Sequence, residues 1–173
     1  MSTLFVNNLN TASGTDITIP TGKKLVVTDT GGIKLPGAVV QIQKGSIGGD
    51  ITTTSTSPVA TGLECAITPK FSTSLLMVQL IGGRSYIAAG QQVDTYLYKD
   101  GSNVNSVGTG RWESVYSTSN HHHGGYSAVH FETAGNTSSR TYQVYFDVNS
   151  GTGYFQDTPG GNNEYLVNLV VME

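Results

Sequence analysis

The chain has 173 residues, a formal net charge of -3 and 12% charged residues, against the roughly 25% that is usual for a soluble domain. Nine Lys and Arg against twelve Asp and Glu leave no positive surplus to neutralise phosphates, which excludes an electrostatic nucleic-acid binder. A single Cys excludes an intrachain disulfide, and no stretch approaches the ~18 apolar residues of a membrane span. Gly, Thr, Ser and Asn supply 72 of the 173 residues, and because these types favour turns and strands over helices, we expect an all-β chain.

Residues 1–36 are expected to form a short N-terminal β segment, and the first ten lack the basic and apolar regions of a secretory signal. Residues 16–19 and 24–28 have strand patterns, and the Pro-Thr-Gly sequence at 20–22 predicts a turn between them. Each strand has only two or three apolar residues, too few for one copy to fold alone. Two interpretations stay open: a flexible β-prone arm, or a trimeric β-prism in which several copies share one core.

Residues 37–60 are predicted to be a linker with a connecting strand. Residues 38–43 are apolar-rich and strand-like, whereas 45–58 contain a Gly-Gly step and an uncharged run of Thr and Ser. Such a composition predicts an extended linker or a long surface loop.

Residues 61–173 predict an antiparallel jelly-roll sandwich that forms a head domain. About eight apolar or alternating runs follow one another at roughly 10–16-residue spacing, separated by Gly, Ser, Asn and Pro. The predicted strands are 63–67, 74–81, 92–99, 112–116, 126–132, 141–148, 153–156 and 165–172.

Two of these runs also predict where their strands lie. Residues 74–81 form a dense apolar run, which predicts a strand buried on both faces. The closing run 165–172 is also apolar, and we expect it in the middle of a sheet, since an apolar edge strand would invite aggregation.

Short β-rich stretches in both halves of the chain carry a family resemblance. They are TLFVNNL at 3–9, TIPTGKKL at 18–25, TDTGGI at 28–33, AITPKFSTS at 66–74, TYQVY at 141–145, GTGY at 151–154 and LVVME at 169–173. In these stretches the sequence resembles tail-fibre-like proteins of marine bacteriophages. The resemblance spans most of the chain and is weakest between Asn105 and Gly125.

The resemblance implies a homotrimeric virion appendage whose jelly-roll head is similar in shape to C1q and tumour-necrosis-factor domains. We expect residues 1–36 to anchor the trimer to other virion proteins of the tail or capsid, and the head to contact a host-surface glycan or protein. The location implied is the phage particle, after synthesis in the host cytoplasm. The alternative is a capsid decoration or tail adaptor protein that stabilises the particle without binding a receptor.

The run His121-His122-His123 is the one conspicuous cluster of ionisable side chains. Asn120 before it and two Gly residues after it predict a loop tip with solvated imidazoles. The alternative is a metal site, because a trimer would bring His121 and His123 of three copies to its axis, as the resemblance to phage fibres with His-x-His sites implies.

No motif in the sequence indicates catalysis or a cofactor. Cys65 is expected to be a buried, inert thiol and His130 a packed strand residue. Four carboxylates lie on or beside predicted strands, but sequence cannot show the facing pair, ~5–10 Å apart, that a glycosidase needs; they are Asp94, Glu113, Glu132 and Asp147. The sequence has no nucleophile elbow, zincin or phosphate-loop pattern, so we expect a non-enzymatic protein.

The nine Tyr and one Trp are the remaining chemical resource of the chain. Tyr and Trp provide rigid amphipathic contact area, which suits protein interfaces and stacking on sugar rings. Alternating Tyr residues on strands favour a trimer interface or the core, and the alternative is surface recognition by Tyr86, Trp112, Tyr116, Tyr126 and Tyr154, which lie near loop-rich segments.

Overall fold

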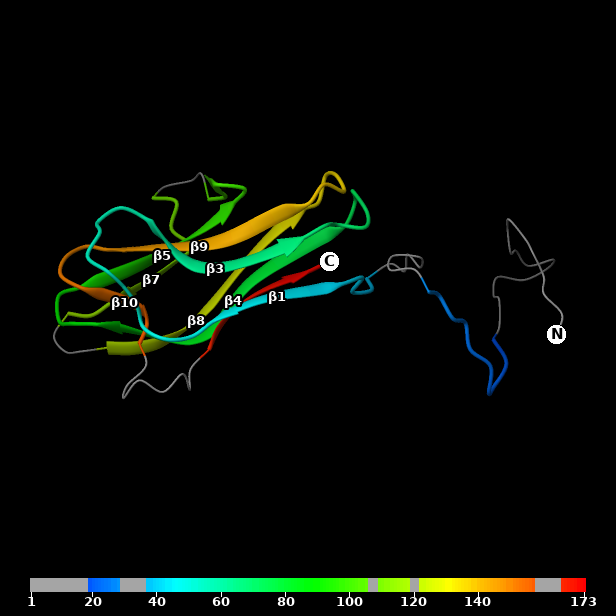
Figure 1. The fold of residues 1–173 in the computed structure, drawn as a ribbon, viewed down its shortest axis with the longest axis horizontal. Coiled ribbons are helices and arrows are strands. Elements are labelled where there is room, and N and C mark those ends of the chain that lie inside the picture. The colour runs from blue at the N-terminus through cyan, green and yellow to red at the C-terminus, as the bar shows by residue number, and fades with distance from the viewer. Residues whose placement is uncertain (1–18, 29–36, 106–108, 119–121, 158–165) are drawn as a thin grey trace.

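The computed structural model describes residues 19–28, 37–105, 109–118, 122–157 and 166–173. Within these ranges the regular elements are all strands, eleven in number, and they form two antiparallel sheets that face each other as a β-sandwich (Figure 1). The all-β class predicted from composition and periodicity is therefore confirmed.

The first sheet is built around the longest strand, β4. On one side β4 pairs with β8, and on the other it pairs first with β11 and then with β10. Strand β1 continues the sheet beyond β11, and β2 continues it beyond β10. The strands of this sheet are β1 (Ile42–Ile47), β2 (Ile51–Thr53), β4 (Leu75–Ile87), β8 (His122–Thr133), β10 (Gly153–Gln156) and β11 (Val167–Met172).

The second sheet has the order β3-β9-β5, and both β6 and β7 pair with β5. Its strands are β3 (Val59–Ile67), β5 (Gln92–Lys99), β6 (Ser102–Asn103), β7 (Glu113–Tyr116) and β9 (Arg140–Val148). The core lies between the two sheets, where alternate residues of β3, β5 and β9 face those of β4 and β11. The largest fully buried side chains include Tyr142, Phe146 and Phe155.

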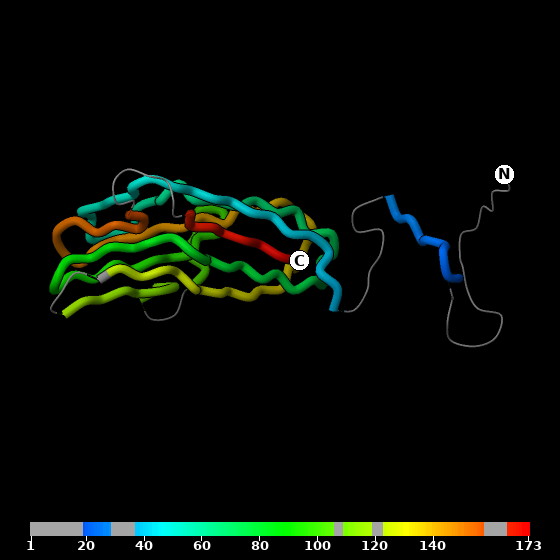
Figure 2. Tube along the Cα trace, turned by 90° about the horizontal axis from the view of Figure 1, so that it is seen from below, coloured from blue at the N-terminus to red at the C-terminus, as the bar shows by residue number. Residues whose placement is uncertain are grey.

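The predicted central position of the closing strand is confirmed, because β11 lies between β1 and β4 (Figures 1 and 2). The prediction that residues 74–81 are buried on both faces is wrong. Leu76, Val78 and Leu80 are fully buried, whereas Leu75 is 59% exposed. The reason is that only one face of this sheet is covered by a second sheet.

Two adjacent glycines let β4 run further than predicted. Gly82 and Gly83 have φ angles of 79° and 70°, and the pairing with β8 shifts register between Gly82 and Ser85. A bulge of this kind bends a strand without ending it. Strand β4 therefore continues to Ile87, beyond the predicted end at residue 81.

The expectation that residues 45–58 form an extended linker or a long loop needs correction. Strand β1 pairs with β11 over six residues, from Ile42 opposite Met172 to Ile47 opposite Val167. Strand β2 pairs with β10. These segments have few apolar residues because they lie at the sheet margin, and their strand partners come from the far end of the chain.

The strand predicted at 24–28 is not formed, and the strand predicted at 16–19 lies almost entirely outside the described residues. The turn between them is confirmed, since Gly22 has φ 80° and the Lys23 N–H donates to the Pro20 carbonyl at 3.0 Å. Leu25 and Val26 are 65% and 72% exposed. A strand needs a partner, and none of the described residues pairs with this segment.

Candidate functional site

The outer face of the first sheet, directed away from the core, carries an unusual number of apolar side chains. Directly opposed residues of antiparallel strands point to the same side. The register of the four strands β1, β11, β4 and β8 therefore places one residue from each in a single row: Ile42, Met172, Met77 and Phe131.

Neighbouring positions widen this row into a patch. Leu75 is 59% exposed, Ile42 58%, Phe131 56% and Val129 42%. We call the outer apolar patch the set Ile42, Leu75, Met77, Val129, Phe131, Val170 and Met172. Exposed apolar residues that gather on one face, rather than scatter singly, mark an interaction surface.

Polar side chains also lie within the row of Val170 and Val129, where Lys44 is opposite Val170 and Gln79 is opposite both valines. The same face becomes more polar away from the patch. One row further from it, Ser46 and Asn168 lie opposite each other, and the Ser46 hydroxyl donates to Asn168 Oδ1 at 2.8 Å. The face thus has an apolar end beside the chain terminus Glu173 and a polar middle.

At the opposite end of this face, the structure brings together three residues singled out from the sequence. Tyr86 of β4 lies opposite His123 of β8 and opposite Tyr154 of β10. The Tyr86 ring centroid is 4.9 Å from that of His123 and 5.2 Å from that of Tyr154, the latter edge to face. We call these three residues the aromatic cluster.

Two charged side chains complete the aromatic cluster. The Arg84 Nε–H donates to His123 Nδ1 at 3.1 Å, and Arg84 Nη2 lies 3.2 Å from His123 Nε2. Asp157 lies 3.7 Å from both Arg84 Nε and His123 Nδ1. Sequence reasoning missed Arg84 and Asp157, because only the register of β4 with β8 and β10 brings them to His123.

The histidine run does not form the loop tip that its flanking residues predicted. His122 and His123 belong to β8 and pair with Ile87 and Tyr86 of β4, whereas His121 lies outside the described residues. A guanidinium within reach of both ring nitrogens of His123 opposes a bound cation there. Within the part of the chain that the structure describes, no three His, Cys, Asp or Glu side chains gather as a metal site.

The other aromatic candidates lie elsewhere. Tyr126 is 3% exposed, stacks on Phe155 and donates its hydroxyl to the Phe155 carbonyl at 2.9 Å. The interpretation of Tyr126 as a surface contact is therefore wrong, because it faces the core. Trp112 is half-buried and packs against the core, and Tyr116, on β7 of the second sheet, is 56% exposed.

The structure also shows a carboxylate pair that sequence could not. Asp94 and Asp147 lie opposite each other on β5 and β9. Arg111 Nε is 2.7 Å from Asp94 Oδ2, and the Tyr96 hydroxyl donates to Asp147 Oδ2 at 2.8 Å. Both carboxylates are nearly buried, at 2% and 7% exposure, so the pair offers no room for a substrate.

Burial raises the pKa of Asp147, with the nearby Asp94 charge adding to the effect against the Tyr96 hydrogen bond and Arg111. Burial likewise raises the pKa of Cys65, which is 5% exposed, and agrees with an inert thiol. His130 is half-buried on β8, and burial lowers its pKa.

Comparison with known proteins adds no relative: no protein-family model matches the chain, and no curated protein matches it. Among the residues that the structure describes, no helix is long and apolar enough to cross a membrane.

Proposed function

We propose that this chain is a non-enzymatic structural subunit of a bacteriophage particle, which forms a homotrimeric fibre or appendage and contributes to host-surface attachment. The sequence resemblance to tail-fibre-like proteins supports this proposal, and so does the two-sheet architecture. The strand order β1-β11-β4-β8 in one sheet and β3-β9-β5-β7 in the other supports a jelly-roll interpretation of the head.

The observation that carries the proposal is the outer apolar patch. Side chains such as Phe131 and Ile42 are more than half exposed in the single chain. Burial of apolar surface contributes about 25 cal/mol per Å². Contact of this face with neighbouring copies around a three-fold axis would remove the patch from water, and such a contact closes into a ring rather than a filament.

In this proposal the two ends of the chain have different roles. Residues 1–36 attach the trimer to other virion proteins. The aromatic cluster lies at the end of the sandwich opposite the C-terminus, as the position of β10 shows (Figure 1), and offers Tyr86 and Tyr154 for contact with a host glycan or protein. Three weak sites on each trimer, and many trimers on a particle, would give firm attachment through effective concentration.

The oligomeric state tests the carrying observation. Light scattering of the purified chain should give three times the 18.3 kDa of one copy. Phe131→Glu should reduce it to the monomer mass, since a charge cannot be buried in an apolar contact without a partner. Ala66→Glu, at an exposed position on the second sheet, is the matched control and should remain trimeric. A folded wild-type monomer would refute the proposal.

Location on the particle separates attachment from the alternative, a capsid decoration or tail adaptor protein in which the same patch clamps neighbouring subunits. Cryo-electron microscopy of particles with this protein labelled should show density at the far end of the tail. Density on the capsid shell would instead favour the decoration role.

A further inference from the structure

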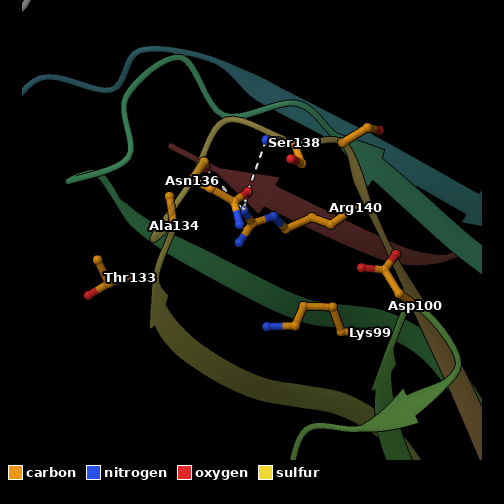
Figure 3. Close-up of a pocket in the computed structure, with 8 residues that line it drawn as sticks. Lys99, Asp100, Thr133, Ala134, Asn136, Ser138 and Arg140 are labelled. Carbon is orange, nitrogen blue, oxygen red and sulfur yellow. Dashed lines mark hydrogen bonds between the residues drawn. The ribbon is translucent and has the colours of Figure 1, made fainter.

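A small cavity opens at the end of the sandwich where β5 ends and β8 turns into β9 (Figure 3). Its volume is about 200 Å³, below the roughly 300–1,000 Å³ of pockets for drug-sized ligands. A cavity of this volume suits a ligand the size of a single monosaccharide unit. The cavity is lined by Lys99, Asp100, Thr133, Ala134, Asn136, Ser138, Ser139 and Arg140.

Two cations meet at one carboxylate beside this cavity. Lys99 Nζ is 2.5 Å from Glu132 Oε2, and Arg140 Nη1 is 3.7 Å from Glu132 Oε1. Tyr142 also donates its hydroxyl to Glu132. Burial works against ionisation of Glu132, but these partners lower its pKa, so the carboxylate is charged at neutral pH. Around Glu132 two positive charges face one negative charge, and Asp100, elsewhere in the lining, balances the remaining positive charge. The two cations and Asp100 thus give the cavity a cationic part and an anionic part.

Both cations are held in place before any ligand arrives. Arg140 is 6% exposed, and its Nη2 donates to the Asn136 carbonyl at 3.1 Å and to Asn136 Oδ1 at 3.0 Å. The Lys99 ammonium has three N–H donors, of which the Glu132 contact uses one, and its side chain is 34% exposed. Preorganised, charge-assisted donors of this kind favour a carboxylate or another oxyanion.

The rest of the lining favours a ligand with hydroxyl groups. Thr133, Ser138 and Ser139 provide hydroxyls, and Ala134 is the one apolar side chain in the lining. In Figure 3, Lys99 and Arg140 extend in the same direction, and Asp100 lies on the side from which they start. Asp100 Oδ1 accepts the Thr141 N–H at 2.8 Å, which leaves acceptor capacity for a ligand hydroxyl.

We infer that this cavity binds one acidic monosaccharide unit, with its carboxylate beside Lys99 and Arg140 and its hydroxyls toward Asp100 and Ser138. The lining has no aromatic ring for stacking, so recognition rests on the acid group and the hydroxyls. The inference rests on the proposed function only for the source of the ligand, an acidic glycan of the host surface. Binding of the monosaccharide can be measured on the purified protein, without the virus particle.

Saturation-transfer difference NMR on the full-length protein tests the inference with matched ligands. D-glucuronate and D-glucose differ in a carboxylate against a hydroxymethyl group, and acetate provides the acid without the sugar. We expect saturation transfer to glucuronate, with a dissociation constant on the order of millimolar for so small a ligand, and at least tenfold weaker binding of glucose and of acetate.

Two variants and a control place the site. Lys99→Met keeps the apolar stem and removes the ammonium, and Ser139→Leu fills the rim without changing the charge; each should abolish the glucuronate signal. Lys23→Met changes an exposed lysine outside the cavity and should bind as wild type does. Light scattering and thermal melting check that the variants are folded.

Equal binding of glucuronate and glucose, equal binding of acetate, or a glucuronate signal that survives both variants would overturn the inference. A trimeric protein that fails to bind glucuronate would refute this inference alone. A monomeric protein that binds it would refute the proposed assembly and leave the binding site standing.

Discussion

Glu173 shows how one side chain can join three separate segments. Its carboxylate accepts the backbone N–H groups of Lys70 at 2.8 Å and Phe71 at 3.0 Å, in the turn between β3 and β4. It also accepts a hydrogen bond from Gln41 Nε2 at 2.5 Å, just before β1. The residue is 6% exposed, so these bonds form largely out of water.

We predict that Glu173→Gln lowers the free energy of unfolding by about 1–3 kcal/mol at pH 7. The new amide N–H₂ cannot accept hydrogen bonds, so at least one of the donors Gln41, Lys70 and Phe71 would lose its acceptor. Burial disfavours the ionised carboxylate, but the bonds from Gln41, Lys70 and Phe71 outweigh it and lower its pKa. This contribution is therefore present at neutral pH and lost as the pH falls through the lowered value.

Urea denaturation at pH 7 and at increasingly acid pH checks the Glu173 prediction. The difference between wild type and variant should shrink on acidification. Glu64→Gln is the control. Glu64 is an exposed residue of β3, and its carboxylate accepts a hydrogen bond from the Gln143 side-chain amide at 3.1 Å. An equal loss in the control would contradict the role given to Glu173.

The neighbouring carboxylates Asp94 and Asp147 should respond oppositely to the same substitution. Asp147→Asn should leave stability at pH 7 equal or higher, because it removes one of two adjacent buried charges, the one that Arg111 does not pair with directly, and keeps an acceptor for the Tyr96 hydroxyl. Asp94→Asn should cost about 1–3 kcal/mol, since Arg111 and Gln92 would lose their charged acceptor.

Melting curves of the two Asp variants across pH give the check. The pKa of Asp147 is raised, chiefly by burial. The folded state therefore binds the carboxyl proton more tightly than the unfolded state does. As a result, the stability of the wild type rises as the pH falls through the raised pKa. Any advantage of Asp147→Asn should accordingly disappear at acid pH. A destabilised Asp147→Asn at pH 7 would show that the charge is needed.

Individual site residues were only partly predictable from the sequence. Tyr86, His123 and Tyr154 were each singled out, but nothing in the sequence indicated that they meet, because this depends on the register of β4 with β8 and β10. Surface recognition by Tyr126 is the alternative that its place near a loop-rich segment suggests, whereas alternation along β8 turns it into the core. Polarity alone does not tell which face of a strand a Tyr occupies.

At the scale of elements, β1 closes against β3 through a single glycine. A Cβ atom at Gly45 would lie 1.9 Å from the backbone carbonyl oxygen of Glu64. No side chain fits there unless the two strands move apart. The segment thus belongs to the sandwich through a contact between its two sheets as well as through the pairing of β1 with β11.

We predict that Gly45→Ala destabilises the head by about 1–3 kcal/mol, the usual cost of overpacking. Gly125→Ala is the matched control, because Gly125 also lies in a strand and its added Cβ would be 3.6 Å from the nearest atom. Chemical denaturation of both variants gives the comparison, and hydrogen exchange should show loss of protection in β1 of Gly45→Ala alone. Equal effects of the two substitutions would contradict this account.

Strands with strong alternation were the elements that sequence predicted best. The bounds 92–99 and 153–156 agree with β5 and β10, and 141–148 with β9 to within one residue. The failures share a physical cause. Among the described residues nothing pairs with the segment 24–28, and β1 and β2 depend on partners from β11 and β10, 100 or more residues later. Strand pairing at long range leaves no local signal.

At the scale of the whole molecule, the contacts of the β-sandwich already include residue 40. The Val40 N–H donates to the Glu173 carbonyl at 2.5 Å, and β1 begins at Ile42. Residues 24–28 form no strand in the single chain, so the prism interpretation requires neighbouring copies to supply the pairing.

Removal of residues 1–36 should therefore leave the sandwich as stable as in the full chain, because every contact of β1 stays in place. If residues 1–36 anchor the trimer as proposed, the truncated protein should fail to join virions. Removal of residues 1–47 should lower the melting temperature and cause aggregation, because it strips β1 from β11 and exposes that apolar strand as an edge. Thermal melting of both truncations and their copy number on purified particles provide the measurements. If the protein that lacks residues 1–36 still assembles at normal copy number, the anchor lies outside those residues. If the protein that lacks residues 1–47 melts like the wild type, β1 is dispensable.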